Sequence, residues 1–260
     1  MTLQKEFINS VTDKVEEIQK YGYCILRGHF ATALIDNCRA AFLPVLKSHL
    51  AKYGHQPNRG TNRHFLPMPF EPPCFAPEFF FDPEILSMVT GILGDRIIAD
   101  QWGCDFPLSG SVYQGVHVDY QRPLFQELSN LRLPAYMLTV SYSLTKITQE
   151  DGPIELAPCT HDMPREEAIA AVEMSKIKML PMLMDVGDVL IRHPWVLHRG
   201  TPNRVHSPRL LVTIRYVRNW YWDNSREVSS IPASVWESLS VEQRSMLRFP
   251  VQTIDQKNDK

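Results

Sequence analysis

Apolar residues in the N-terminal third of the chain recur every three or four positions, which is the spacing of one buried helix face. Two stripes have this spacing: Phe7, Val11, Val15 and Ile18, and then Leu34, Cys38, Phe42, Val45 and Leu46. A short strand, YGYCILRG, is predicted between them. A third helix is predicted to begin at Asp82-Pro83, because aspartate caps helices and proline suits their first turn. Its buried stripe would comprise Ile85, Met88, Val89 and Ile92.

Residues 54–78 interrupt this pattern with many prolines and large apolar side chains. This composition differs from that of a low-complexity linker and predicts a long ordered loop, a lid or a surface for a partner. A lid would bring His64, Phe65 and Met68 toward a binding site.

From Arg96 onward, short runs of branched and aromatic residues alternate with turn residues, which predicts strands. The runs are RIIADQW, SVYQGVHV, AYMLTVSYSL, PIELAP, MLPMLMDVGDVLIRH and RLLVTIRYV. Their spacing favours a β sandwich or barrel. One helix interrupts them near PREEAIAAVEMSK, with a capping-like start at Asp162 to Arg165.

Neither a repeat nor a linker divides these strands, so one domain is expected over residues 1–260. Residues 1–95 would form an N-terminal helical layer with the proline-rich loop, residues 96–218 the β core, and residues 219–260 a mixed C-terminal cap. The predicted class is mainly β with flanking helices.

The near balance of acidic and basic residues limits the classes of binding partner that are expected. Lys and Arg number 27 and Asp and Glu 29, a net charge of -2, which does not favour nucleic acid or an anionic membrane. A small-molecule or protein partner remains. Because the N-terminus lacks a signal-peptide core and no run reaches the roughly 18 apolar residues of a membrane span, a cytoplasmic protein is expected. The five scattered cysteines are predicted to be buried thiols.

The segment GVHVDY places His117 and Asp119 two positions apart in a predicted strand. Residues i and i+2 of a strand project from the same face, so an imidazole and a carboxylate can point at one metal ion. Alone, this spacing is also common on the wet face of a sheet. A third ligand would have to come from a neighbouring strand, and His198 in DVLIRHPWVLHRGTPN is the candidate. Two histidines and one carboxylate form the facial arrangement of non-haem iron(II) oxygenases, which leaves positions open for a cosubstrate and O2.

Arg209 follows His198 and opens the predicted strand RLLVTIRYV, where it would share a face with Leu211, Thr213 and Arg215. A guanidinium beside the metal can bind the far carboxylate of a dicarboxylate with two hydrogen bonds. The dicarboxylate that fits this chemistry is 2-oxoglutarate.

Four stretches resemble, in order, motifs of the phytanoyl-CoA dioxygenase family of iron(II)- and 2-oxoglutarate-dependent oxygenases. They are HVD at 117–119, DGP at 151–153 followed by PCTH at 158–161, HRGTPN with His198, and Arg209. The family pattern reads HxD, then Asn-Gly-Pro followed by Pro-Gly-Ser-His, then a distal His with Asn nearby and an Arg at about this interval. The opening YGYCILRGHF is similar to the family's glycine-containing strand, so the resemblance covers residues 18 to about 216.

The resemblance implies a double-stranded β-helix, the jelly-roll core of cupin-like proteins. It implies that His117, Asp119 and His198 hold Fe(II) and that Arg209 holds 2-oxoglutarate. Relatives often carry a glutamine shortly before the first ligand, and Gln114 stands there as a second cosubstrate candidate. The implied reaction is hydroxylation of a C–H bond, with O2 consumed and succinate and CO2 released.

The chain departs from the family pattern in two places. Cys159 replaces the usual glycine of the PGSH turn, which puts the backbone of that turn in question. Ile154 replaces a threonine that some relatives place near 2-oxoglutarate. Asp119 is informative by its presence, because related halogenases carry a small residue there; a carboxylate favours oxygen insertion or desaturation.

The substrate is less determined. Tyr120, Arg122 and Phe125 follow the metal ligands and would line the cavity mouth. The arginines near that mouth favour a small polar or anionic metabolite: Arg122, Arg192, Arg199 and Arg215.

Alternatives remain at this point. His193 competes with His198 as the distal ligand, and His161 is better interpreted as a turn residue bonded to backbone groups. The same ligands would also suit a cupin-like metalloenzyme of another reaction class, and a non-catalytic β sandwich that binds a ligand is a further hypothesis.

Overall fold

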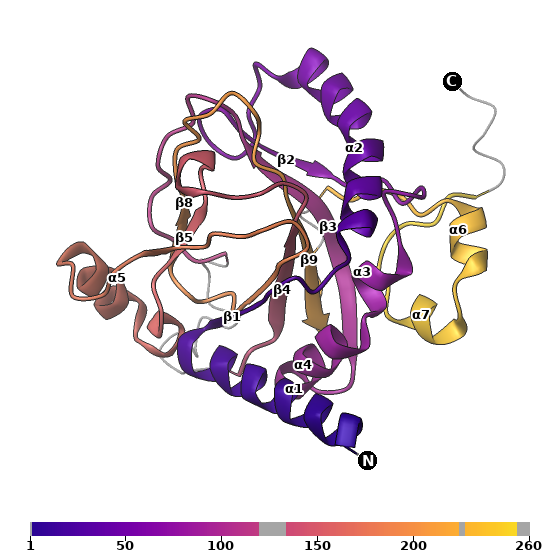
Figure 1. Cartoon of the computed structure of the whole chain (residues 1–260), viewed down its shortest axis with the longest axis horizontal. Helices are drawn as coiled ribbons and strands as arrows, with labels where there is room; N and C mark the ends of the chain where they lie inside the picture. Colours follow the sequence, from indigo (N-terminus) through magenta and orange to yellow (C-terminus); the bar gives the residue numbers. More distant parts are fainter. Residues whose placement is uncertain (1, 120–133, 224–226, 254–260) are drawn as a thin grey trace.

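Two antiparallel β sheets, flanked by helices, form the core of the molecule (Figure 1). The coordinates are a computed structural model, and the structure describes residues 2–119, 134–223 and 227–253. The predicted class, mainly β with flanking helices on a jelly-roll core, is confirmed.

The larger sheet has six strands in the order β1-β7-β4-β9-β3-β2, and every neighbouring pair is antiparallel. Its strands are β1 (Tyr23–Leu26), β2 (Arg63–Pro67), β3 (Ile97–Pro107), β4 (Met137–Ser143), β7 (Val189–Arg192) and β9 (Leu211–Arg218). Two of them, β1 and β2, come from the N-terminal part of the chain, so the predicted helical layer also supplies strands to the core.

Strand β9 shows how one strand serves two environments. Val212 and Ile214 belong to the main apolar cluster, while Thr213 and Arg215 line a cavity on the opposite face. Successive side chains of a strand point to opposite faces, so this alternation separates an apolar outer face from a polar inner face. The same division holds along β3, β4 and β7.

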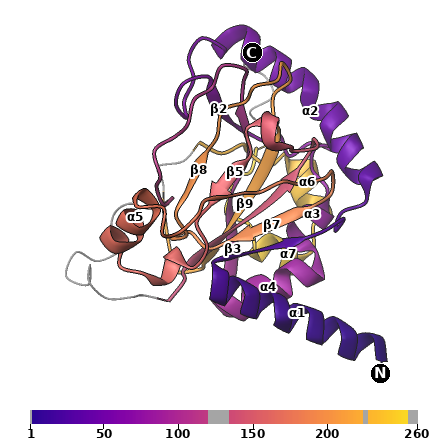
Figure 2. The same ribbon diagram turned by 60° about the vertical axis from the view of Figure 1, so that its left-hand side comes forward.

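The smaller sheet has the order β6-β5-β8, with β5 (Ile154–Leu156), β6 (Leu180–Pro181) and β8 (His198–Gly200). It lies on the side of the molecule that carries α5 (Arg165–Glu173) (Figure 2). Gly152 and Cys159 flank β5 in the left-handed backbone region, at φ 76° and 66°. Glycine occupies such positions at little cost, which explains why the family turn carries glycine where this chain has Cys159.

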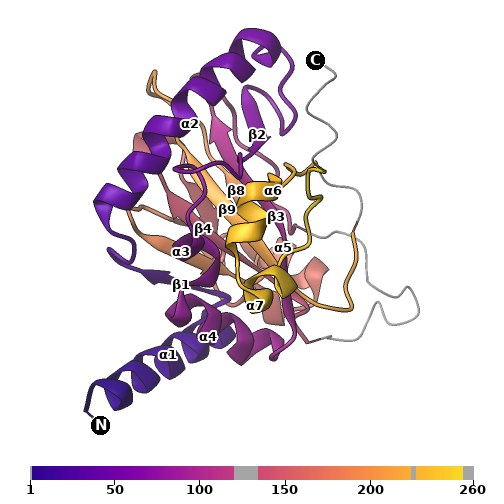
Figure 3. The ribbon, with the colours of Figure 1, turned by 90° about the vertical axis from the view of Figure 1, so that its right-hand side faces the viewer.

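Helices cover the outer face of the larger sheet. Figure 3 shows α2 (Thr32–Tyr53), α3 (Pro77–Phe81), α6 (Ala233–Ser238) and α7 (Val241–Ser245) in front of the strands. The ring of Phe79 in α3 stacks on Tyr142 of β4 at 4.5 Å between centroids. α1 (Thr2–Tyr21) packs against α4 (Pro83–Leu93). Within the described residues, none of the helices is both long enough and apolar enough to cross a membrane.

The predicted helices are present, with changes in detail. Asp82 caps α4 as expected, because its Oδ1 accepts the backbone N–H groups of Glu84 and Ile85 at 3.0 and 2.9 Å. Val45 was wrongly assigned to the buried stripe of α2; Ile35 is buried instead and Val45 is 37% exposed. The capping-like start at 162–165 is also wrong, since α5 begins after Pro164 without a side-chain cap.

Two further predictions about local structure are wrong. Residues 63–67 form edge strand β2 within the stretch predicted as a loop or lid, with His64 and Met68 fully buried. Residues 111–118 form no regular strand. The backbone N–H of Gln114 bonds to Gly200 O and that of His117 to His198 O, so the segment advances three residues while β8 advances two. This extra residue interrupts the ladder, as a bulge does.

Cysteine burial is confirmed for four of the five thiols: Cys24, Cys38, Cys74 and Cys104. Cys159 is exposed, so the prediction that it is buried is wrong.

Candidate metal centre and cosubstrate cavity

A cavity of about 820 Å³ lies between the inner face of the larger sheet and β8. Its wall is part polar and part apolar, and it contains the predicted metal ligands and both predicted cosubstrate residues. Its charged and polar lining includes Arg59, Asp105, Gln114, His117, Asp119, Arg192, His198, Arg209, Thr213 and Arg215.

His117 and His198 are paired across two neighbouring segments. The backbone N–H of each bonds to the carbonyl of the other at 2.9 Å, which makes them a hydrogen-bonded antiparallel pair. Directly opposed residues of such a pair project from the same face. The two imidazole rings accordingly lie 4.4 Å apart between centroids.

Backbone carbonyls determine which ring nitrogen of each histidine carries the hydrogen and which one can bind a metal ion. His117 Nδ1 lies 2.8 Å from Gly115 O, and His198 Nδ1 lies 3.0 Å from Val196 O. A carbonyl can only accept, so each Nδ1 carries the hydrogen and each Nε2 presents a lone pair. This hydrogen bond to the remote ring nitrogen is the support that metal-bound histidines usually have.

Asp119 completes the group, and its two oxygens have different neighbours. Oδ1 lies 3.4 Å from His198 Nε2, whereas Oδ2 lies 2.8 Å from Arg192 Nη2. One ligand atom from each of His117, Asp119 and His198 lies within 4.8 Å of the others. The i and i+2 relation thus brings both side chains together although residues 111–118 are not a regular strand.

The environment sets the protonation states that a metal needs. Burial would raise the pKa of Asp119, but the nearby charge of Arg192 acts against burial, and the pKa lies well below its usual range. Burial, aided by the Arg192 charge, lowers the pKa of His198, although Asp119 opposes it. An ionised carboxylate and a neutral imidazole are the forms that bind metal. The donor set and its protonation therefore fit iron(II) in a facial triad.

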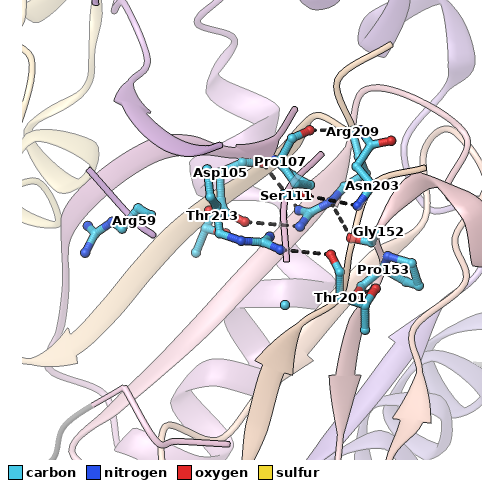
Figure 4. A network of polar contacts seen from close by, with 12 residues as sticks. Arg59, Asp105, Pro107, Ser111, Gly152, Pro153, Thr201, Asn203, Arg209 and Thr213 are labelled. Atoms are coloured by element: carbon cyan, nitrogen blue, oxygen red, sulfur yellow. Dashed lines mark hydrogen bonds and ion pairs between the residues drawn. The ribbon is translucent and has the colours of Figure 1, made fainter. Parts of the chain in front are cut away.

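Arg209 is 2% exposed and lies directly before β9, where it shares the inner face with Leu211, Thr213 and Arg215 as predicted. Its Nη2 lies 3.1 Å from Asp105 Oδ2, and its Nε donates to Gly152 O at 3.3 Å (Figure 4). These contacts fix the guanidinium in the cavity wall.

A second buried arginine, Arg63, adds positive charge behind this wall. It is 1% exposed, its Nη2 donates to Thr201 O at 2.8 Å, and its Nη1 has no hydrogen-bond partner within the described residues. Burial lowers the pKa of Arg63 and the nearby Arg209 charge lowers it further, while Asp105 opposes both. The two guanidinium groups of Arg209 and Arg63 and the one carboxylate of Asp105 have a net positive charge, which favours the binding of an anionic ligand.

Gln114 lines the cavity, and both ends of its amide contact backbone groups. Its Nε2 donates to Arg59 O at 3.0 Å and its Oε1 accepts from Gly200 N at 2.9 Å. The side chain therefore ties the loop before β2 to β8. A contact between Gln114 and the cosubstrate stays a prediction.

The end of the cavity away from Arg209 combines charge and aromatic rings. Arg215 forms a two-point ion pair with Asp100, at 2.7 and 2.8 Å, and a third contact with Asp223 Oδ2 at 3.1 Å. Tyr221 and Trp222 line this end. The Trp222 side chain is 62% exposed.

The structure separates the other candidates from the triad. His193 lies outside the group of potential metal ligands and receives the Trp195 backbone N–H on Nδ1 at 3.2 Å. His161 lies 3.0 Å from Gln19 O, which agrees with a turn residue bonded to backbone. Arg199 pairs with Glu155 at 2.8 Å and does not line the cavity. Tyr120, Arg122 and Phe125 lie outside the described residues.

Several cavity residues escaped prediction: Arg59, Gln101, Asp105, Thr139, Ser141 and Asp223. Most of them are polar residues at alternate positions of otherwise apolar strands. That alternation is the signal that identifies them. A polar side chain in a strand that is buried on both faces requires a hydrogen-bonding partner, so it marks the face where such partners lie.

Two antiparallel sheets that enclose a polar cavity, with two histidines and an aspartate converging in its wall, define the class of non-haem iron oxygenases. The chain belongs to the phytanoyl-CoA dioxygenase (PhyH) family, whose sequence profile matches residues 18–210. It is thus an iron- and 2-oxoglutarate-dependent oxygenase, and the two alternative classes considered above are not supported.

Solved structures share the fold. The non-haem α-ketoglutarate-dependent epimerase SnoN from nogalamycin biosynthesis is 15% identical, with a TM-score of 0.61 over 84% of this chain and 94% of that one. The carbocyclase SnoK from the same biosynthesis is 18% identical, with a TM-score of 0.59 over 79% and 83%. AviO1 from Streptomyces viridochromogenes Tue57 is 15% identical, with a TM-score of 0.58 over 82% and 96%.

Proposed function

We propose that His117, Asp119 and His198 bind the iron through two Nε2 atoms and one carboxylate oxygen. The observation that supports this assignment most strongly is the convergence of their ligand atoms within 4.8 Å. The Nδ1 hydrogen bonds of both histidines support it further, because they leave the Nε2 lone pairs free.

Arg209 is proposed to hold the distal carboxylate of 2-oxoglutarate. It is buried in the same cavity, and its remaining N–H groups can form a charge-assisted pair with a carboxylate. Arg63 strengthens the positive potential without lining the cavity, and the hydroxyl of Thr213 lies on the same inner face of β9.

When bound, iron and 2-oxoglutarate supply the oxidation: O2 is consumed, succinate and CO2 are released, and one oxygen atom enters a substrate C–H bond. The chain's own part is to orient that bond and to keep water out. Asp119 fills the third protein position with a carboxylate, which favours hydroxylation over halogenation. The named relatives include an epimerase and a carbocyclase, so the pose of the substrate decides among outcomes.

The substrate is proposed to be a small polar or anionic metabolite. The cavity volume of about 820 Å³ is within the range that encloses such ligands. Arg192, Arg209 and Arg215 each pair with an aspartate, whereas Arg59 stacks on Phe65 at 4.9 Å and has no acidic partner within the described part of the chain. Arg59 is therefore the cation of the wall that is available to an anionic group of the substrate.

The proposed function is tested with protein reconstituted anaerobically with Fe(II). Labelled 2-oxoglutarate is added with fractionated metabolite pools in air, and CO2 and succinate are measured. Iron-dependent release that one fraction stimulates supports the proposal, and anionic fractions are expected to be enriched among the active ones. Release that is independent of added iron, or that Zn(II) supports equally, contradicts it.

A cytoplasmic location is also proposed, and cell fractionation tests it.

A further inference from the structure

Arg192 contacts two of the three proposed metal ligands. It ends β7, lines the cavity and is 6% exposed. Its Nη2 lies 2.8 Å from Asp119 Oδ2. Its Nη1 lies 3.3 Å from His198 Nδ1. Since that Nδ1 already donates to Val196 O, the second approach is a contact between two donors and not a hydrogen bond. The guanidinium is thus held by Asp119.

The two oxygens of Asp119 have divided roles. Oδ1 faces His198 Nε2, the side from which a metal would be bound, and Oδ2 faces the guanidinium. We propose that Arg192 is a positioning residue that reserves Oδ2 and so restricts Asp119 to binding the metal through one oxygen. This inference rests on the proposed function of the triad.

The restriction matters because a carboxylate can bind a metal with one oxygen or with two. Binding through both oxygens would occupy a coordination position that the cosubstrate or O2 requires. Arginine is suited to prevent this, since its guanidinium stays charged and forms an ion pair with Oδ2 at 2.8 Å.

The charge of Arg192 has opposite effects on the binding of the metal ion and on the binding of 2-oxoglutarate. A cation beside the site repels a divalent metal ion and weakens its binding, but it attracts dianionic 2-oxoglutarate. Without the metal, the same cation compensates the Asp119 carboxylate through their ion pair at 2.8 Å. Loss of Arg192 should therefore strengthen metal binding and weaken cosubstrate binding.

The test uses Arg192→Met, which removes the charge and all donors with little change in volume. Calorimetric titration with Mn(II), without O2, measures metal affinity; titration of the Mn(II)-loaded protein with 2-oxoglutarate measures cosubstrate affinity. We expect Mn(II) to bind about 3- to 10-fold tighter and 2-oxoglutarate about 10- to 100-fold weaker than in the wild type. Mn(II) should also raise the melting temperature of the variant by more than that of the wild type.

Arg215→Met is the matched control, because Arg215 is also a buried arginine of the cavity wall, but the aspartates that it pairs with are Asp100 and Asp223. Its Mn(II) affinity should stay within about twofold of the wild type. Co(II) absorption gives a further signature, since only the Arg192 variant should gain a coordinated oxygen.

Unchanged or weaker Mn(II) binding in Arg192→Met would overturn the inference. Weaker 2-oxoglutarate binding with unchanged Mn(II) affinity would show that Arg192 contacts the cosubstrate and not Asp119, which also overturns it. If the methionine variant does not fold, Arg192→Gln takes its place with the same expected shifts. Failure of the wild type itself to bind Mn(II) and 2-oxoglutarate would instead refute the proposed function.

Discussion

The inner and outer faces of the larger sheet are built from the same strands, yet their side chains differ in kind. On β4, Leu138 and Val140 join the main apolar cluster, while Thr139 and Ser141 line the cavity. The outer face excludes water and supports the fold, whereas the inner face presents hydrogen-bonding groups and arginines to ligands. Substitutions on the inner face should therefore change binding and turnover, and those on the outer face should change stability.

The largest effect is expected on the inner face, from Asp119→Ala. Removing a proposed metal ligand should lower substrate-coupled succinate formation more than about 100-fold. The measurement is succinate and product per mole of enzyme. Asp185→Ala, an exposed aspartate paired with Lys146, is the control and should retain activity. Full coupled turnover by Asp119→Ala would contradict the assignment.

Phe79→Ala tests the outer face. Phe79 is fully buried and stacks on Tyr142, so truncation should cost about 3–5 kcal/mol of the free energy of unfolding. Denaturant unfolding measures this loss, and the affinity of the folded fraction for Mn(II) should be unchanged. Leu43→Ala, at a position 46% exposed, should cost less than about 0.5 kcal/mol. Equal losses from both substitutions would contradict the apolar role of this face.

Arg209→Gln should separate cosubstrate binding from metal binding. Loss of the charged fork is expected to raise the KM for 2-oxoglutarate about 10- to 100-fold while Fe(II) affinity changes little. Arg204→Gln provides the control, since Arg204 is exposed and its ion pair with Glu150 is long, at 3.7 Å. A KM equal to that of the wild type would exclude Arg209 as the anchor.

The smallest effect concerns a contact between the turn that joins β1 to α2 and the capping residue of α4. His29 Nε2 lies 3.1 Å from Asp82 Oδ1, and this contact raises the pKa of His29 above its ordinary 6.5, although burial opposes it. Protonated His29 therefore stabilises the fold below about pH 6.5, and that contribution is lost as pH rises through its folded pKa. Relative to the wild type, His29→Gln should lose about 0.5–1 kcal/mol near pH 5.5 and less near pH 8.5. Thermal unfolding at both pH values measures the difference, and a loss that is larger at high pH would contradict this linkage.

The residues of the candidate site can be predicted from the sequence, because the signal lies in residue types and in their order. The sequence predicts His117, Asp119, His198 and Arg209, and all four line one cavity. The pairing of Arg192 with Asp119 was not predicted, since it depends on how β7 approaches the segment before residue 120 in space.

The fold was predicted in class but not in every element. The strand β2 escaped prediction because proline and aromatic residues obscure its alternation, and its pairing with β3 joins Arg63 to Pro107 across the chain. Residues 111–118 have the composition of a strand, but their register against β8 prevents a continuous ladder. Both differences arise from long-range pairing, which local pattern does not contain.

Formation of the iron and 2-oxoglutarate complex tests the central claim most directly. Fe(II) is titrated anaerobically into the protein with 2-oxoglutarate, and the visible charge-transfer absorption of the iron–keto-acid chelate is recorded. We predict that it saturates at one equivalent in the wild type and in His206→Ala, an exposed histidine away from the cavity, and that His198→Ala abolishes it. Absence of this absorption in the wild type, or its full retention in His198→Ala, would contradict the account.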